Sequence, residues 1–283
     1  MKFLLMISKQ LIKGIKNPWK AILFLVSTIY NIFIDLKHHK KLISAEELKE
    51  LDKIKEHLIT RTNIEEHLIL KELEDIKRQS IKKTDISDHL VTLFVESLST
   101  KPRLIVELGV RGGESTFVLE RVAKLCDSTL ISVDIEDCSD ISSYKNWIFV
   151  QSDDIEFAKR FEKWCARHDI QPKINVLFVD TSHIFENTVQ EIENWFPFLR
   201  ERSKVFFHDT NLKRLFFRRD GSMGVGRNNK RGVIRAIEEY FDKGFNEKED
   251  FIELIDGWQI KHYANCNGFT ILEKIEQSSG YEK

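Results

Sequence analysis

The feature that most constrains the fold is an alternation, from about residue 86 onward, of short apolar runs with longer amphipathic stretches. Short runs rich in β-branched and aromatic residues predict strands, and apolar residues at helical spacing predict helices. The runs expected to form strands are residues 104–108, 130–133, 147–150, 176–179, 204–207, 251–255 and 268–273. The stretches expected to be helical are residues 115–125, 155–168, 185–199 and 232–241. This alternation predicts an α/β fold, a doubly wound, seven-stranded, mostly parallel Rossmann-like sheet with an N-terminal helical extension.

Residues 1–41 differ from the rest of the chain in being both basic and apolar. They hold eight lysines and one acidic residue, Asp35, which gives 8 − 1 = +7, and they include the most apolar run, residues 21–34. That run is shorter than the roughly 20 residues of a spanning helix, and no small-residue cleavage site follows it. We expect either a helix in the membrane interface, with lysines near anionic headgroups, or a helix packed on the main domain or a second subunit. A true transmembrane anchor is the third alternative.

The other divisions follow changes of character along the chain. Residues 42–90 carry Ser44 and Glu47 in a capping-box pattern, which predicts a helical lead-in or lid, or an arm used in dimer contacts. Residues 91–276 are expected to form the main domain, and residues 277–283 a tail. The net charge of −1 does not point to nucleic acid. Four cysteines without metal-ligand spacing indicate reduced thiols in a cytoplasmic protein.

A glycine turn follows the first expected strand. Gly109 and Gly113 let the backbone turn tightly and approach a ligand, and the next helix begins with free N–H groups. The spacing is not GxGxxG, which argues against a dinucleotide. Asp134 ends the next strand, where a carboxylate is placed to accept hydrogen bonds from ribose hydroxyls. Glu107, just before the turn, can face a cationic ligand such as a sulfonium.

Two later groups of polar residues, 180–183 and 208–210, directly follow apolar strands. The carboxyl ends of parallel strands meet at the edge where open α/β sheets bind ligands, so we expect these groups to converge. Asp180 and Asp209 offer the oxygen ligands that Mg²⁺ prefers, and His183 suits a general base because an imidazole titrates near neutrality. The alternatives are that His183 caps the following helix and that His208 is a buried, satisfied imidazole.

The pattern Glu107-x-Gly109-x-x-x-Gly113, together with Asp134, resembles the first motif of class I S-adenosylmethionine-dependent methyltransferases. The segments VDTSHIFENTVQEIENWFPFL, FFHDT and NCNGFTILEK narrow the resemblance, over roughly residues 100–275, to the macrolide-sugar O-methyltransferases and cephalosporin hydroxylase-like proteins. The resemblance implies S-adenosylmethionine as cofactor. The residues expected to contact it are Glu107, Gly109, Gly113, Ser115, Asp134, Ser152 and Asp153.

The loop after the third expected strand has two interpretations. In methyltransferases this loop flanks the adenine, so the resemblance implies that Ser152 or Asp153 reaches the adenine amino group. Capping of the following helix by Asp153 or Asp154 is the alternative. Both can hold at once.

The narrower resemblance also implies roles for the later loops. In the sugar enzymes, an Asp matching Asp180 and an acidic pair matching His208 and Asp209 hold a divalent metal, and a His matching His183 is the base. Here His208 replaces one carboxylate. The implied metal ligands are therefore Asp180, Asp209 and His208, the implied metal is Mg²⁺, and the substitution places that metal in doubt.

Residues 211–231 form a basic, glycine-rich segment. Such a loop can close over an acidic or phosphorylated substrate, or be an ordinary solvated loop. Phe216 and Phe217 within it are expected to stack on sugar rings or line a pocket.

Together these features predict an S-adenosylmethionine-dependent O-methyltransferase acting on a hydroxyl of a sugar, glycan or glycosylated small molecule, with Asp180, His183 and Asp209 at the reaction centre. The rivals are a hydroxylase-like enzyme and a catalytically diverged membrane-surface binding protein. We expect a small-molecule or glycan substrate and no nucleic acid as partner. We also expect that the chain can form a homo-oligomer. Its expected location is the cytoplasm, with peripheral contact at the inner face of the membrane as a further possibility.

Overall fold

The computed structural model describes residues 64–218, 221–226 and 229–275. The expected segment 1–41, the capping box at Ser44 and the tail 277–283 lie outside these residues. The chain divides into two compact units, Met1–Glu72 and Leu73–Lys283, and α4 (Ile64–Ser80) crosses that division. The predicted division of the chain at residues 41, 90 and 276 stays a prediction.

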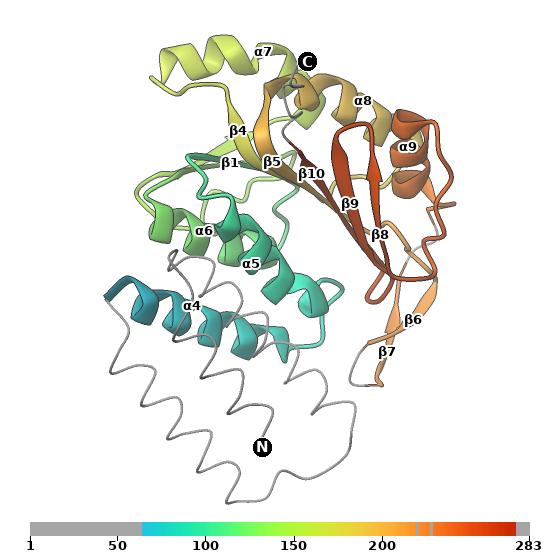
Figure 1. The fold of residues 1–283 in the computed structure, drawn as a ribbon. Helices are drawn as coiled ribbons and strands as arrows, with labels where there is room; N and C mark the ends of the chain where they lie inside the picture. Colours follow the sequence, from blue (N-terminus) through green and yellow to red (C-terminus); the bar gives the residue numbers. More distant parts are fainter. Residues whose placement is uncertain (1–63, 219–220, 227–228, 276–283) are drawn as a thin grey trace, which may run out of the picture. The chain divides into compact units, whose positions relative to one another are not determined.

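The second unit is built on one eight-stranded sheet with the strand order β3-β2-β1-β4-β5-β10-β9-β8 (Figure 1). The strands from β3 to β5 pair in parallel, and β10, β9 and β8 pair antiparallel. The bounds of the strands are β1 Leu104–Leu108, β2 Thr129–Asp134, β3 Trp147–Gln151, β4 Ile174–Val179, β5 Leu199–His208, β8 Phe251–Ile255, β9 Trp258–Tyr263 and β10 Phe269–Lys274. The strand order reverses between β1 and β4, which is where a doubly wound sheet opens its ligand crevice.

The predicted fold class is confirmed, but the sheet has eight strands rather than the predicted seven. The additional strand is β9, which forms a hairpin with β8 and pairs Ile255 with Trp258. Asp256 and Gly257 connect the two strands with φ values of 48° and 78°. An Asp-Gly pair with positive φ at both positions is the usual two-residue hairpin turn.

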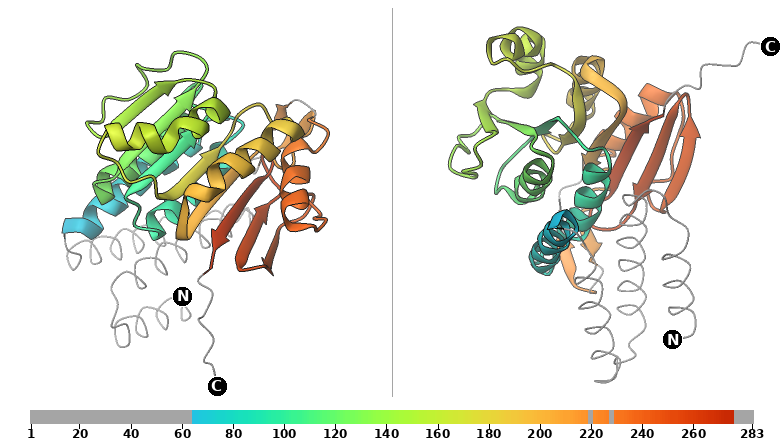
Figure 2. Two further views of the ribbon diagram at one scale, coloured as in Figure 1. Left: turned by 90° about the horizontal axis from the view of Figure 1, so that it is seen from above. Right: turned by 60° about the vertical axis from the view of Figure 1, so that its left-hand side comes forward.

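Helices cover both faces of the sheet (Figure 2). Helices α5 (Leu90–Ser99) and α6 (Glu114–Cys126) lie on one face. Helices α7 (Asp154–Arg167), α8 (Phe185–Trp195) and α9 (Gly232–Phe241) lie on the other, where Phe161, Trp195 and Ile237 join the main apolar core. The strand β1 is buried along its whole length because both faces are covered.

The predicted helix over residues 185–199 ends earlier than expected. The α-helix stops at Trp195, and a 3₁₀ turn, η2 (Phe196–Phe198), follows before β5 begins at Leu199. Pro197 lies inside that turn, and its missing N–H and fixed φ oppose continuation of an α-helix.

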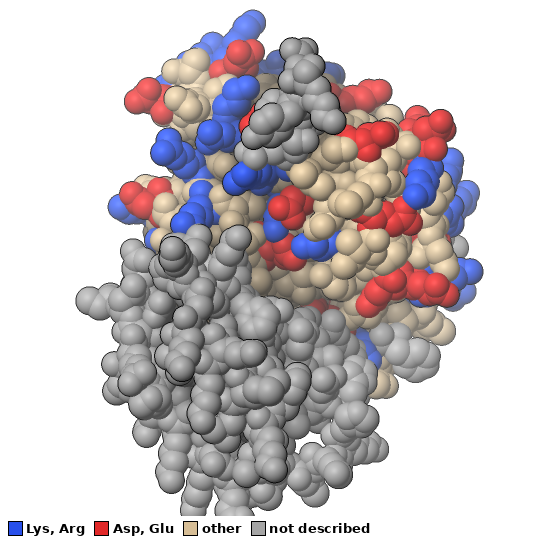
Figure 3. Space-filling view, viewed as in Figure 1, with Lys and Arg blue, Asp and Glu red and all other residues tan. Residues whose placement is uncertain are grey.

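The segment after β5 carries a two-stranded antiparallel ribbon that the sequence pattern does not predict. Its strands are β6 (Leu215–Phe217) and β7 (Met223–Val225). On the face shown in Figure 3, basic and acidic side chains are interspersed over the described surface. Among the helices within the described residues, none has the length and apolarity of a membrane span.

Candidate functional site

The glycine turn after β1 brings the first loop against the end of β4. A Cβ on Gly109 would lie 2.1 Å from the carbonyl oxygen of Asp180, and Gly109 has a φ of +87°. The Gly109 amide donates to the Val133 carbonyl at 2.9 Å, and the Asp180 amide donates to the Leu108 carbonyl at 2.9 Å. Only glycine fits such a close approach with positive φ. The first loop and the loop that begins at Asp180 are therefore fastened together.

Gly113 is the N-cap of α6 and has a φ of +77°. A Cβ there would lie 2.4 Å from Cγ2 of Ile141, so a larger residue would collide. At Gly112, in contrast, an added Cβ would meet nothing within 4 Å. The turn is therefore closely packed at both of its predicted glycines and open between them.

Glu107 lies wholly inside the protein, on the α6 side of β1. Its carboxylate accepts hydrogen bonds from the hydroxyls of Ser115 (2.6 Å), Ser132 (2.6 Å) and Thr116 (2.9 Å). Burial raises its pKa to about 7, although these hydroxyl donors oppose the shift. The structure thus ties Glu107 and Ser115 to each other, where they hold the first turn of α6 against β1. Their expected contacts with the cofactor stay predictions.

Asp134 ends β2 and holds the glycine turn in place. One carboxylate oxygen accepts from the amides of Val110 (2.7 Å) and Arg111 (3.0 Å), and the other from the amide of Glu136 (2.9 Å). A carboxylate offers about four acceptor positions, and Asp134 is partly exposed. It therefore keeps acceptor capacity, and its contact with ribose hydroxyls stays a prediction.

The loop after β3 lies beside Asp134, because the Ser152 amide donates to the Asp134 carbonyl at 2.9 Å. The Ser152 hydroxyl accepts from Arg160 at 2.9 Å. Asp153 accepts from the amide of Glu156 at 2.9 Å and so caps α7. The capping interpretation of Asp153 therefore describes this structure, and contact of either residue with adenine stays a prediction.

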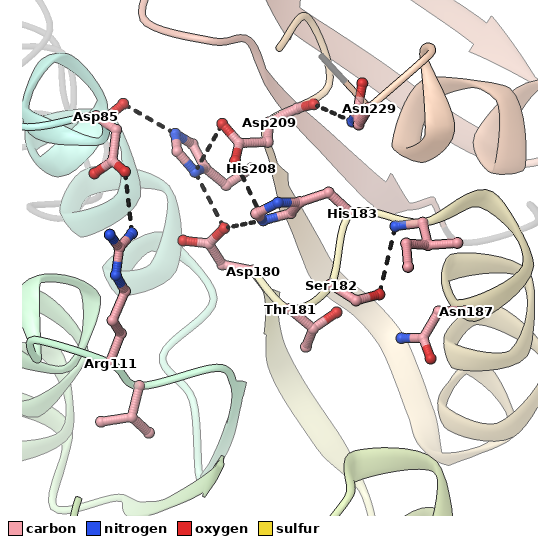
Figure 4. A network of polar contacts seen from close by, with 12 residues as sticks. Asp85, Arg111, Asp180, Thr181, Ser182, His183, Asn187, His208, Asp209 and Asn229 are labelled. Atoms are coloured by element: carbon pink, nitrogen blue, oxygen red, sulfur yellow. Dashed lines mark hydrogen bonds and ion pairs between the residues drawn. The ribbon is translucent and has the colours of Figure 1, made fainter. Parts of the chain in front are cut away.

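Four ionisable side chains meet at the carboxyl ends of β4 and β5 (Figure 4). Nε2 of His183 lies 2.9 Å from Oδ1 of Asp180 and 3.2 Å from Oδ2 of Asp209. Nδ1 of His208 lies 3.2 Å from the same Oδ1 of Asp180 and 3.5 Å from Oδ1 of Asp209. The predicted convergence of residues 180–183 with 208–210 is therefore what the structure shows.

The backbone of this cluster is strained at two positions. His183 has a φ of 59° and Asp209 a φ of 57°, in the left-handed region that non-glycine residues rarely adopt. Gly232, the first residue of α9, permits the left-handed backbone of His183, because a Cβ on residue 232 would lie 2.4 Å from the His183 carbonyl oxygen. Such strain persists only where the surroundings hold it, and it concentrates at functional sites.

The electrostatics of the cluster follow from its burial and its mutual contacts. Although burial opposes the shift, the carboxylates of Asp209 and Asp180 raise the pKa of His208 to about 10. Burial likewise opposes the shift at Asp180, but the two imidazoles hold the pKa of Asp180 below its usual range. The hydrogen bond and charge of Asp180 raise the pKa of His183 against burial. Burial raises the pKa of Asp209.

The cluster has a further contributor that the sequence patterns missed. Nε2 of His208 donates to the backbone carbonyl of Asp85 at 3.1 Å, and the carboxylate of Asp85 pairs with Arg111 at 3.3 Å. Asp85 precedes the predicted start of the main domain at residue 91. A backbone carbonyl leaves no signal in the residue types, so only the fold reveals this contact.

The donor set that the structure brings together mixes carboxylate oxygens with an imidazole nitrogen. Asp180, His183 and Asp209 each offer a ligand atom within 4.8 Å of the others, whereas the predicted set was Asp180, His208 and Asp209. Mg²⁺ prefers an octahedron of oxygens, and here the two carboxylates are bridged by ring nitrogens. Imidazole suits zinc, copper, iron and nickel instead. The two carboxylates suit Mg²⁺ and the imidazole suits these other metals, so use of Mg²⁺ stays a prediction.

The basic segment after β5 is fastened to the rim of this cluster. Nε of Arg218 donates to the Thr84 carbonyl at 3.0 Å, and Nδ2 of Asn229 donates to the Asp209 carbonyl at 3.3 Å. Phe216 is 7% exposed, and a Cβ on Gly224 would lie 2.3 Å from its ring. Its ring is therefore not an exposed surface for stacking on a sugar, and the alternative that it lines a pocket stays a prediction. The side chain of Phe217 lies outside those described.

No curated protein matches the sequence. Among solved structures, a protein from Corynebacterium glutamicum is 13% identical, with a TM-score of 0.47, and the match covers 82% of this chain and 100% of that one. The MycE methyltransferase of the mycinamycin biosynthetic pathway, solved with Mg and SAH, is 16% identical, with a TM-score of 0.45, and the match covers 75% of this chain and 57% of that one. CalS11, a TDP-rhamnose 3′-O-methyltransferase of calicheamicin biosynthesis, is 14% identical, with a TM-score of 0.44 and coverages of 82% and 96%. At these sequence identities and TM-scores, the likeness to solved structures supports no conclusion about the function of this chain.

A family model gives the more specific comparison. The model of a methyltransferase domain matches residues 106–210. The match runs from within β1 to just after β5, so it includes the glycine turn, Asp134 and the cluster of Asp180, His183, His208 and Asp209. Residues 106–210 thus carry a methyltransferase domain, and the predicted resemblance of the chain to class I S-adenosylmethionine-dependent methyltransferases is confirmed.

Proposed function

We propose that the chain transfers a methyl group from S-adenosylmethionine to a hydroxyl of a sugar, glycan or glycosylated small molecule, with His183 as general base. The observation that carries the proposal is the position of His183. Its imidazole bridges Asp180 and Asp209, and Asp180 is fastened to the glycine turn through Leu108 and Gly109. A base is therefore held beside the loop that the resemblance assigns to the cofactor.

The residues present fit S-adenosylmethionine. The glycine turn opens onto free space at Gly112, α6 begins beside it, and Asp134 is partly exposed with acceptor capacity left. When bound, the cofactor supplies a methyl group on a positively charged sulfur. The carboxylate of Asp134 and the N-terminus of α6 would orient the adenosyl and carboxylate parts of that molecule.

The contacts of His183 indicate how a hydroxyl would be activated. Its Nε2 faces two carboxylates, so this nitrogen carries a hydrogen and Asp180 fixes the orientation of the ring. Among the described residues, none makes a hydrogen bond to Nδ1 of His183. Nδ1 of His183 would accept the hydroxyl proton during methyl transfer, while the bound cofactor would supply the methyl group and leave as a neutral thioether. A positioned base is needed because an aliphatic hydroxyl is a weak acid.

The first prediction concerns cofactor binding. Titration calorimetry of the full chain should detect binding of S-adenosylmethionine, and Asp134→Ala should weaken it by at least about tenfold, since hydrogen bonds to a charged group are lost. Asp134→Asn retains one acceptor and should weaken it less. Asp137→Ala, at an exposed position of the same loop, is the matched control. Undiminished affinity in Asp134→Ala, or tight NAD binding instead, would overturn the proposal.

The second prediction concerns His183. Release of S-adenosylhomocysteine, measured against a panel of free sugars, nucleotide sugars and glycosylated small molecules, should identify an acceptor. His183→Ala should then retain cofactor affinity and lose turnover by about 100-fold or more. Because Asp180 raises the pKa of His183 and the base must be neutral, the rate should rise as pH increases through a value above that of an ordinary histidine. His168→Ala, on the exposed end of α7, is the control. Turnover that survives His183→Ala would exclude this residue as the base.

Membrane contact, oligomer formation and cellular location are further proposals about this chain. We propose peripheral membrane contact through residues 1–41, which lie outside the described residues, because of their basic and apolar composition. Formation of a homo-oligomer and a cytoplasmic location also stay predictions. Vesicle flotation of the full chain with anionic lipid, and light scattering, test the first two.

A further inference from the structure

The ribbon of β6 and β7 has one buried face and one exposed, apolar face. Side chains of a strand alternate between its two faces, and Phe216 pairs with Gly224 on the buried face. The residues of the other face, Leu215, Met223 and Val225, are 56%, 60% and 79% exposed. We call these three residues the ribbon face. The ribbon projects from the eight-stranded sheet (Figure 1), and apolar side chains gathered on a projecting surface typically mark a site of interaction.

The chain around the ribbon face is strongly basic. Residues 211–231 hold seven lysines and arginines but only one acidic residue. One of the seven, Arg231, is already paired with two glutamates. Lys213 and Arg214, in contrast, are exposed directly before Leu215. The ribbon face is therefore bordered by positive charge.

A distant segment of the chain extends this basic border. Nε of Arg218 donates to the Thr84 carbonyl at 3.0 Å, which holds the end of β6 beside the turn that follows α4. In that turn Ile81 is 76% exposed, and Lys82 and Lys83 are exposed as well. Apolar and basic side chains from two segments thus lie together at this end of the described unit.

The charge around an exposed apolar face decides which partner suits it. Strand β8, at the edge of the sheet, offers a useful comparison, because Ile252 and Leu254 are 68% and 70% exposed there. Residues 247–256 around them hold five acids and one lysine. An anionic bilayer attracts basic side chains and takes apolar ones into its interfacial layer. Such a bilayer therefore suits the ribbon face and is unsuited to β8.

Two other covers from the same protein suit the ribbon face less well. Residues 1–41 hold eight lysines and one acid, so their charge has the same sign as that of the ribbon. In a two-fold symmetric dimer built on the ribbon, each basic border would meet its own copy. Both arrangements bring like charges together, which opposes association.

We propose that the ribbon face and its basic border dock on an anionic lipid bilayer. This surface does not include residues 1–41, and docking through it does not depend on methyl transfer. The chain enters the ribbon shortly after Asp209, and Nδ2 of Asn229, which follows the ribbon, donates to the Asp209 carbonyl at 3.3 Å. Docking of the ribbon therefore holds the candidate site near the lipid surface.

A fluorescent label tests contact at the ribbon itself. Met223→Cys in the full chain is labelled with a polarity-sensitive dye, and Leu254→Cys on β8 is the matched control at a similarly exposed apolar position. The native cysteines are buried or half-buried, and labelled wild type gives their background. Vesicles of phosphatidylcholine with phosphatidylglycerol should shift the emission at residue 223 to shorter wavelength, whereas vesicles of phosphatidylcholine alone should not. Unchanged emission at residue 223, whether or not the chain floats with the vesicles, or an equal shift at both residues would overturn the proposal.

Vesicle affinity provides a second measurement. Leu215→Ser/Val225→Ser should lower the affinity of the full chain for the anionic vesicles at least about tenfold, since two apolar side chains no longer enter the lipid. Ile252→Ser/Leu254→Ser, the same change on β8, should leave that affinity as in wild type, and raised salt should weaken wild-type binding. Undiminished affinity in the ribbon variant counts against the proposal. So does a lower mass of both variants than of wild type by light scattering without lipid, because that result assigns the ribbon to contact with β8 of a second copy.

Discussion

At the scale of single residues, the site depends on a few positions where one atom decides the geometry. Gly109 is the clearest, because the space for its Cβ is already filled by the carbonyl of Asp180, 2.1 Å away. Its positive φ adds a second obstacle to any side chain. The residue that carries the expected metal ligand and the residue that turns the first loop are therefore coupled through the backbone.

The third prediction follows from this coupling. Gly109→Ala should lower the free energy of unfolding by about 2 kcal/mol or more, through backbone strain and collision with Asp180. It should also weaken binding of S-adenosylmethionine. Thermal unfolding followed by circular dichroism measures the first effect and calorimetry the second. Gly112→Ala is the matched control three residues away, where an added Cβ meets nothing within 4 Å. Equal stability of these two variants would contradict the role of Gly109.

How far the sequence predicts individual residues depends on what defines their role. The spacing of Glu107, Gly109 and Gly113 is a local pattern, and it predicts the strand, turn and helix that the structure contains. The three hydroxyls around Glu107 come partly from β2, so no local pattern predicts that its carboxylate is enclosed. The carbonyl of Asp85 is invisible to sequence analysis altogether, since every residue has one.

At the scale of elements, the same distinction between local and distant causes explains what was predicted and what was missed. The helices over residues 115–125, 155–168 and 232–241 agree with α6, α7 and α9 to within one residue at each end, because their apolar residues recur with the helical period. The missed strand β9 also carried a local signal, the turn of Asp256 and Gly257 between two alternating runs. An Asp-Gly turn between two alternating runs is by itself sufficient to predict the hairpin of β8 and β9.

The ribbon of β6 and β7 is a different case. Each of its strands has three residues, too few for a period to be recognised. Its position depends on distant contacts, such as the hydrogen bond from Arg218 to Thr84 and the packing of Phe216 on Gly224. The burial of Phe216 could not be predicted, because the ribbon that buries it forms only in the folded chain.

At the scale of the whole molecule, the described unit contains several buried acids whose pKa values are shifted in opposite directions. Burial raises the pKa of Glu107 to about 7 and that of Glu191 to about 8, and the neighbouring carboxylate of Asp154 adds to the shift of Glu191. Opposing its burial, the charges of Lys204 and Lys261 lower the pKa of Glu96 below its ordinary value. Acids with a raised pKa, such as Glu107 and Glu191, favour folding at low pH. Acids with a lowered pKa, such as Glu96, favour folding at higher pH.

The fourth prediction combines these signs into a stability profile. Between about pH 4.5 and 7, the Glu107 carboxyl is protonated in the folded state but ionised in the unfolded state. Its contribution to the free energy of unfolding is therefore fully present below pH 4.5 and is lost as pH rises through that window. The loss is on the order of 3 kcal/mol. Glu96, with a lowered pKa, contributes above its ordinary pKa and loses that contribution as pH falls. Stability should therefore be greatest near about pH 5 and decline toward neutrality.

Urea unfolding followed by tryptophan fluorescence from about pH 4 to 8 measures the profile. Glu107→Gln should flatten the decline above pH 5, because the amide cannot ionise, whereas Glu162→Gln, at an exposed position on α7, should leave it unchanged. A decline that persists in Glu107→Gln with the wild-type slope would assign the pH dependence to other buried acids, with Glu191 the next to replace.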